Sequence, residues 1–150
     1  MSTSQFYCSS EELEVGHVVY PGRWGQTLRT YNRRFTPHWQ LVRELVYEVV
    51  RLRQFSDKPS RLEALFVCSS ERDLRDFQQS TGRDNELVYE VALVDPTLPN
   101  HTGDLDFVNT LEYDTVSDLE ERALRYWEGQ VLTKPEIATL SPAKIVRRIE

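Results

Sequence analysis

The sequence is poor in residues that form cross-links and metal sites. It contains two cysteines, Cys8 and Cys68, one methionine and three histidines. Two cysteines do not form a disulfide framework, and no CxxC or HxxxH spacing occurs, so we expect neither a disulfide-stabilised fold nor a bound metal. Both cysteines lie in predicted strands, where a free thiol usually packs as a small apolar group.

Long hydrophobic runs are also absent. No segment approaches the ~20 consecutive apolar residues that a membrane-spanning helix needs. The N-terminus has no apolar stretch after a basic start, which is the pattern of a signal peptide. We therefore expect a cytoplasmic protein that does not bind a membrane.

Positive charge is not in excess. Eighteen Lys and Arg residues stand against 24 Asp and Glu residues, for a net charge of −6. This balance disfavours general binding to nucleic-acid phosphates, so we expect a protein partner rather than a nucleic acid. One local exception is the basic loop that contains Arg29, Arg33 and Arg34.

The remaining composition is that of a globular domain, with 39% hydrophobic and 28% charged residues. A chain of 150 residues predicts a single domain over 1–150. Hydrophobic periodicity and turn signals predict strands at 5–9, 17–20, 62–68, 87–94, 105–110, 137–140 and 144–149. They predict helices at 38–54, 71–81 and 117–129, with loops at 21–35 and 95–103. Short strands between irregularly placed helices indicate an α+β fold with about three helices.

Local signals mark the starts of these helices. Thr36 and Pro37 are typical of the first helix start, while Ser70 with Asp73 and Ser117 with Glu120 resemble capping boxes for the other two. The first helix carries apolar residues at helical spacing, which predicts that this face is buried. These residues are Trp39, Val42, Val46, Val49 and Val50.

Three other features each allow two interpretations. Arg23, in the glycine-framed stretch PGRWG, would contact a phosphate, or the stretch is a turn that packs Trp24 on the core. Glu90 interrupts an apolar strand and is expected to pair with Arg51 or Arg61 rather than to act in catalysis. Tyr126 and Trp127 would stack on an aromatic ligand, but their helical spacing favours a place in the core.

Four stretches resemble one known superfamily when they are taken in order: FYCSSEELEVGHVVYPG, KPSRLEALFVCSSERDLRDF, ELVYEVALVD and KPEIATLSPAKIVRRI. Together they are similar to the small bacterial and phage ADP-ribosyltransferase-like proteins, and the opening resembles the rifamycin-modifying enzymes most. RELVYEVVRLRQFSDKPSRLEALF and ALRYWEG resemble an uncharacterised bacterial family related to them. The resemblance implies a split β-sheet fold that binds NAD in a cleft.

The resemblance also implies which residues would hold NAD. The first-strand position, where relatives carry His, falls on Cys8 between Tyr7 and Ser9. The middle-strand position falls near Phe66, where the rifamycin enzymes carry Tyr, or at Ser60 beside Arg61.

The acidic residue of the superfamily falls on Glu136, or alternatively on the loop that contains Asp104 and Asp106. Lys134 stands where arginine-specific transferases carry another acid, which implies an acceptor other than arginine. The implied function is transfer of ADP-ribose from NAD to an unknown acceptor, with Glu136 as the catalytic residue. The alternative is a catalytically degenerate relative that serves as a protein- or nucleotide-binding module.

Overall fold

The computed structural model describes residues 4–30, 38–109, 113–131 and 133–150. Its strands form two antiparallel sheets. The first sheet has the order β1 (Gln5–Ser9), β4 (Leu87–Leu93), β7 (Ala143–Ile149) and β2 (Val18–Val19). The second has the order β3 (Leu65–Val67), β6 (Pro135–Thr139) and β5 (Asn100–Asp104). The predicted α+β split-sheet fold is confirmed.

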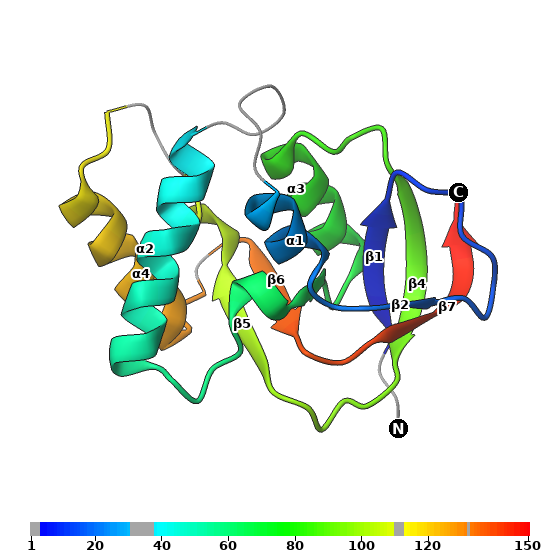
Figure 1. Cartoon of the computed structure of the whole chain (residues 1–150). Helices are drawn as coiled ribbons and strands as arrows, with labels where there is room; N and C mark the ends of the chain where they lie inside the picture. Colours follow the sequence, from blue (N-terminus) through cyan, green and yellow to red (C-terminus); the bar gives the residue numbers. More distant parts are fainter. Residues whose placement is uncertain (1–3, 31–37, 110–112, 132) are drawn as a thin grey trace.

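The helices accompany the sheets in chain order. The α-helices are α1 (Arg23–Arg29), α2 (His38–Gln54), α3 (Glu71–Thr81) and α4 (Val116–Glu128), and two 3₁₀ turns are η1 (Arg61–Glu63) and η2 (Leu105–Phe107). Figure 1 shows α2 and α4 together at one end, the four-stranded sheet at the other, and α1 and α3 between them. None of the helices in the described ranges has the length and apolar character required to cross a bilayer.

Within the described residues, a bridge between Phe6 on β1 and Cys68 just after β3 joins the two sheets. The amide of Phe6 donates to the carbonyl of Cys68 at 2.8 Å, and the amide of Cys68 donates back at 2.9 Å. This pair of bonds brings the end of β1 beside the second sheet.

Local capping defines the later helices. Ser70 caps α3, and its hydroxyl accepts from the amide of Asp73 at 3.1 Å, as predicted. The capping box of α4 is formed by Thr115 and Asp118, not by Ser117 and Glu120, because the Thr115 hydroxyl and the Asp118 carboxylate satisfy each other's amides. The helix therefore begins earlier than expected.

Two predicted loops contain regular structure. The loop predicted at 21–35 contains α1, and the loop predicted at 95–103 contains most of β5, while the strand predicted at 105–110 begins as η2. Both errors have a non-local cause, because α1 forms against η1 and β5 forms by pairing with β6. The predicted helix start at Thr36 and Pro37 and the basic residues Arg33 and Arg34 lie outside the described residues.

The predicted inner face of α2 is confirmed at Val50, which is 5% exposed and lies in the core, but it is wrong at three other positions. Trp39, Val42 and Val49 are 44–45% exposed, whereas Glu44 and Tyr47 are buried at 1% and 0%. The helix turns its polar side inward because Glu44 has buried cationic partners and the Tyr47 hydroxyl donates to the carbonyl of Phe107.

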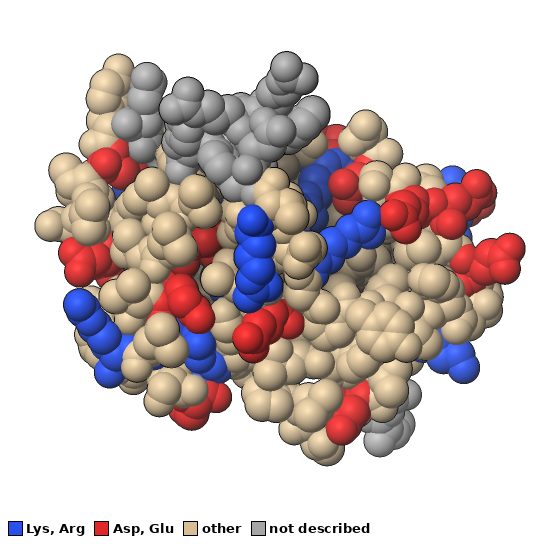
Figure 2. Space-filling model, in the orientation of Figure 1, with Lys and Arg blue, Asp and Glu red and all other residues tan. Residues whose placement is uncertain are grey.

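Glu90 also differs from expectation. Its carboxylate pairs with Arg147 on the neighbouring strand at 3.2 Å, and not with Arg51 or Arg61. Arg147 lies opposite Glu90 in the register of β4 and β7. Figure 2 shows basic and acidic side chains interspersed over one face of the molecule, which fits many such surface pairs.

Candidate functional site

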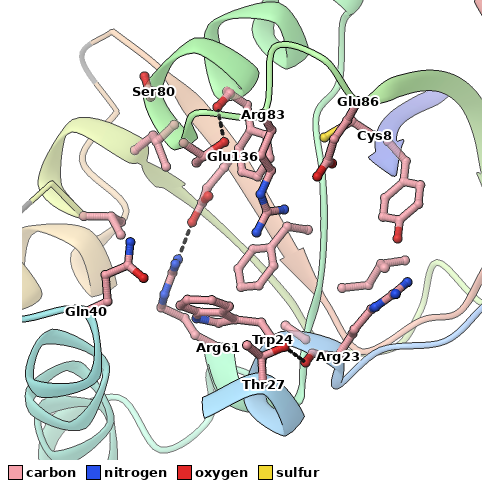
Figure 3. A pocket seen from close by; sticks show the side chains of 18 of the residues that line it. Cys8, Arg23, Trp24, Thr27, Gln40, Arg61, Ser80, Arg83, Glu86 and Glu136 are labelled. Atoms are coloured by element: carbon pink, nitrogen blue, oxygen red, sulfur yellow. Dashed lines mark hydrogen bonds and ion pairs between the residues drawn. The ribbon is translucent and has the colours of Figure 1, made fainter. Parts of the chain in front are cut away.

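A cavity of about 420 Å³ lies where the two sheets approach each other. Its walls come from the end of β1, from α1, from β3 and from the end of α3 with the turn that follows it. This volume lies within the range of small-molecule sites, which is roughly 300–1,000 Å³. Figure 3 shows the side chains that line it.

Seven of the eight predicted site residues line this cavity. They are Tyr7, Cys8, Ser9, Arg23, Arg61, Phe66 and Glu136. Ser60 does not: its hydroxyl donates to Glu48 at 2.9 Å and accepts from the amide of Leu62 at 3.2 Å. The first strand and Glu136 therefore share one cavity. Ser60 lies outside it and caps η1.

Positive charge is concentrated in the cavity. Four arginines and two glutamates line it, although the whole chain carries a net charge of −6. Arg83 reaches into the cavity from the turn after α3, as Figure 3 shows, and stacks over Phe77 at 5.7 Å. Arg23 is 65% exposed and pairs with Glu11 at 2.8 Å. This lining suits an anionic ligand.

Arg43, on α2, also lines the cavity. One of its terminal nitrogens donates to Glu44 at 3.1 Å. Its Nε is buried and has no hydrogen-bond partner among the described residues. A buried donor without a partner costs about 1–3 kcal/mol, so this nitrogen destabilises the fold locally.

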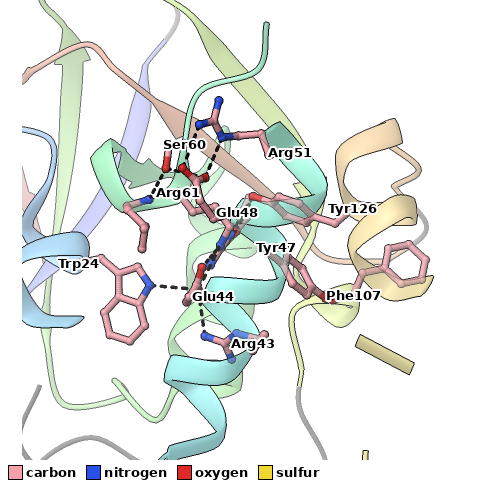
Figure 4. A network of polar contacts seen from close by, with 12 residues as sticks. Trp24, Arg43, Glu44, Tyr47, Glu48, Arg51, Ser60, Arg61, Phe107 and Tyr126 are labelled. Atoms are coloured by element: carbon pink, nitrogen blue, oxygen red, sulfur yellow. Dashed lines mark hydrogen bonds and ion pairs between the residues drawn. The ribbon is translucent and has the colours of Figure 1, made fainter. Parts of the chain in front are cut away.

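The floor of the cavity is a buried ion-pair network, shown in Figure 4. Arg61 Nε donates to both carboxylate oxygens of Glu44, at 3.2 and 3.1 Å. Arg61 Nη1 donates to the Tyr126 hydroxyl at 2.8 Å and to Glu136. The Tyr126 hydroxyl in turn donates to Glu136 Oε1 at 3.1 Å. One guanidinium thus holds two carboxylates that lie far apart in sequence.

This network sets the protonation states of its members. Burial lowers the pKa of Arg61, but the carboxylates of Glu136 and Glu44 outweigh it and hold that pKa well above its usual value. Burial raises the pKa of Glu44, but Arg61 and Arg43 outweigh it and bring the pKa below its usual value. Burial raises the pKa of Tyr126, which therefore stays a neutral donor. At neutral pH, Arg61 and Glu44 are therefore charged and Tyr126 is neutral.

Trp24 connects this floor to α1. Its indole nitrogen donates to Glu44 at 3.0 Å, and its side chain lines the cavity. The adjacent Gly25 lies against η1 so closely that an added Cβ would be 1.8 Å from the carbonyl oxygen of Leu62. Only glycine allows α1 to approach this far, so Gly25 places both Arg23 and Trp24.

Cys8 lies beside Glu86 on the side of the cavity opposite the floor, as Figure 3 shows. Burial and the Glu86 carboxylate raise the pKa of its thiol to about 12. The nucleophilic form of cysteine is the thiolate, and almost none is present at neutral pH. Cys8 therefore acts as a neutral wall residue.

The remaining candidates have structural roles. Asp104 is buried and accepts from the amides of Asp106, Thr133 and Lys134, and Asp106 pairs with Lys134 at 3.4 Å. Neither aspartate lines the cavity. Trp127 is fully buried, as is Tyr126, so the predicted core position is confirmed for both.

Sequence reasoning missed Glu44 and Arg83 as site residues. The spacing of Glu44, Glu48 and Arg51 on one helix face was an available signal of an inward polar stripe. Arg83 offered no signal, because a charged residue after a helix-ending glycine is common on surfaces. In the described ranges, no group of three or more His, Cys, Asp or Glu side chains is placed to share a metal ion.

The sequence matches the model of a protein family. Among curated proteins, none matches the sequence significantly. The family model for DUF2441, described as a protein of unknown function, matches residues 23–149. The matched part contains α1, the buried floor and Glu136, and leaves out only β1 and β2 among the elements. The chain belongs to the DUF2441 family.

Proposed function

We propose that this protein binds NAD in the arginine-lined cavity and transfers its ADP-ribose to an acceptor. The observation that carries the proposal is that the strand end Tyr7–Ser9 and Glu136 line the same cavity. The ADP-ribosyltransferase resemblance implies these two segments for NAD binding, and they lie at opposite ends of the chain.

The chemistry of the cavity supports a dinucleotide. NAD carries a diphosphate, two ribose rings and two aromatic bases. Arg23, Arg43 and Arg83 offer guanidinium groups that can bind phosphate oxygens by paired hydrogen bonds. Trp24 and Phe66 give the cavity aromatic surfaces on which a base can stack. The resemblance named Ser60 and Arg61 among the residues that would hold NAD. Because Ser60 lies outside the cavity and Arg61 is paired with Glu44 and Glu136, we assign the phosphates to these three arginines.

Glu136 is the proposed catalytic residue. In the reaction the bond between the ribose and nicotinamide breaks, nicotinamide leaves with the bonding electrons, and the ribose carbon becomes cationic. The acceptor then bonds to that carbon and loses its proton. A carboxylate next to this carbon stabilises the cation and accepts a hydrogen bond from a ribose hydroxyl. Arg61 and Tyr126 hold Glu136 in one orientation for this purpose.

A second candidate is a relative that binds NAD or another nucleotide without transfer. Two observations favour it. Oxygen Oε1 of Glu136 already accepts from Arg61 and Tyr126, and Cys8 is a neutral thiol at the position where relatives carry His. This candidate keeps the same cavity and the same arginines. In either case we place the protein in the cytoplasm, where its free thiols would stay reduced, and expect a protein acceptor or partner.

Labelled NAD incubated with the protein and a cell extract tests the first candidate. We expect label to reach an acceptor with wild-type protein and to be lost with Glu136→Gln. Glu48→Gln is the matched control, because Glu48 forms a partly buried ion pair with Arg51 but does not line the cavity. Equal label with Glu136→Gln and wild type would contradict the catalytic role.

Thermal stabilisation by NAD, measured beside label transfer, separates the two candidates. Ligand at about 100 times its dissociation constant adds roughly 2.7 kcal/mol to the free energy of unfolding. We expect Arg83→Gln to weaken this stabilisation at least about tenfold in apparent affinity, while Arg75→Gln on the exposed side of α3 leaves it unchanged. Stabilisation without label transfer supports the binder, and absence of stabilisation at millimolar NAD rejects both the transferase and a binder of NAD.

A further inference from the structure

Helix α2 carries apolar residues on two sides: Tyr47 and Val50 are buried in the core at 0% and 5%, and a second set faces outward. Its inward side carries Glu44, which is 1% exposed, whereas its outward side carries large apolar residues. A helix of a globular protein normally turns its apolar stripe to the core. The outward stripe of α2 therefore lacks a partner among the described residues.

The outward residues have a regular spacing. Val42, Leu45, Val49 and Leu52 are 44, 53, 45 and 59% exposed, and we name these four the α2 seam. Their separations of three, four and three residues are those of the a and d positions of a heptad. Valine at a and leucine at d is the combination that favours a seam between two helices.

Three residues of the α2 seam, Val42, Leu45 and Val49, form one wall of an apolar groove of about 330 Å³. Val116 from α4 lines the same groove and is 57% exposed. Trp39, one turn before the seam, is 45% exposed. With roughly half the surface of each side chain accessible, these six residues present about 500 Å² of apolar area, which is near the upper limit for a monomer.

This area suits a second copy of the chain. Two such faces would bury about 1,000 Å² together, which is the lower bound of a specific interface. The charged residues that line the groove are one cation, Arg53, and one anion, Glu120. A mixed border of this kind is self-complementary under two-fold symmetry. A membrane surface is a poorer partner because the chain carries a net charge of −6.

We propose that the α2 seam packs against the α2 seam of a second copy of this chain in a two-fold dimer. The α2 seam contains none of the four cavity arginines. Arg43 belongs to the same helix but lines the cavity and not the groove, so the dimer does not depend on what the cavity binds. The dimer explains why α2, whose inner side is already packed in the protein, also carries apolar residues at a and d spacing on its outer side.

Sedimentation of the full chain tests this proposal over about a hundredfold range of concentration. We expect the mass to rise from 17.6 kDa towards twice that value. Leu45→Lys places a charge in the seam and should raise the dissociation constant at least about tenfold. Val146→Lys is the matched control, because Val146 is 42% exposed on β7 away from α2, and it should leave the dimer intact.

Cross-linking gives a second, independent readout. The native thiols of Cys8 and Cys68 are buried, so a disulfide between two copies must come from a cysteine introduced at the surface. Under mild oxidation we expect Leu45→Cys to form a disulfide-linked dimer and Val146→Cys to stay monomeric. A wild-type chain that is monomeric at every concentration, or a dimer that Leu45→Lys does not weaken, would overturn the proposal.

Discussion

Arg61 and Glu136 are ion-paired beneath the cavity although 75 positions separate them in the sequence. The pair joins η1 to β6, and through Glu44 it also reaches α2. The floor of the candidate site is thus also a structural junction. Substitutions here are expected to act on stability and on ligand binding together.

Replacement of Arg61 by methionine should be strongly destabilising. The carboxylates of Glu44 and Glu136 are each 1% exposed, and both would lose their main cation. Removal of one partner from a buried network costs about 3–5 kcal/mol. Urea unfolding measures the loss. Arg125→Met breaks an exposed pair with Glu121 and should cost less than about 1 kcal/mol, and a similar loss for both variants would contradict the junction.

Acid should weaken the fold through Glu44 and Glu48. The folded-state pKa of each lies below the ordinary value of 4.5, for Glu44 because Arg61 and Arg43 overcome the effect of burial, and for Glu48 because Arg51 donates to it. A lowered folded pKa gives stability that is complete above pH 4.5 and is lost as pH falls through the folded value. We expect the free energy of unfolding to drop between pH 5 and pH 3.

The pH dependence of a variant identifies the group responsible. Glu44→Gln cannot titrate at this position, so its unfolding free energy should fall less steeply over the same pH interval than that of the wild type. Arg75 pairs with Glu71 on the surface of α3, so Glu71→Gln should keep the wild-type slope. If the unfolding free energy of Glu44→Gln fell with pH as steeply as that of the wild type, other carboxyl groups would be responsible for the acid sensitivity.

Cys8 should be chemically unreactive despite its place in the cavity wall. Burial, followed by the charge of Glu86, raises its pKa to about 12, so the thiolate fraction at pH 8 is about one in ten thousand. Reaction of the native protein with a thiol reagent should be slow, and unfolding in denaturant should release both Cys8 and Cys68. Rapid alkylation of Cys8 in the folded protein would contradict this assignment.

Gly25→Ala should displace α1 from η1. The new methyl group would lie 1.8 Å from the carbonyl oxygen of Leu62 and 2.7 Å from its carbon, and both are backbone atoms that cannot move aside cheaply. We expect a loss of about 2–4 kcal/mol in unfolding free energy and a change in Trp24 fluorescence. Thr27→Ala on the exposed side of α1 should change neither by a comparable amount.

Local signals in the sequence predicted part of this fold. Helix α3 begins at a capping serine and ends at Gly82, and β4 has the apolar character of an internal strand, so neighbouring residues were enough to identify them. Helix α1 could not be found in this way. It has only seven residues, and its position depends on the contact of Gly25 with Leu62, which a local pattern does not contain.

The candidate site was predictable to a similar degree. A family resemblance named the first strand and Glu136, and these lie at one cavity. Periodicity placed Val50 in the core correctly but also assigned Trp39, Val42 and Val49 to it, because it counts apolar residues and cannot detect that Glu44 meets Arg61. Buried charge pairs between distant segments are the part of this protein that a single sequence does not reveal.

The bridge between Phe6 and Cys68 has a mechanical consequence. Two backbone hydrogen bonds between these residues link the two sheets. The cavity lies beside this link. The link holds β1, with Tyr7 and Cys8, against the second sheet, which carries Glu136 on β6. Loss of these two hydrogen bonds would let the opposite walls of the cavity separate while the ladders inside each sheet stay intact.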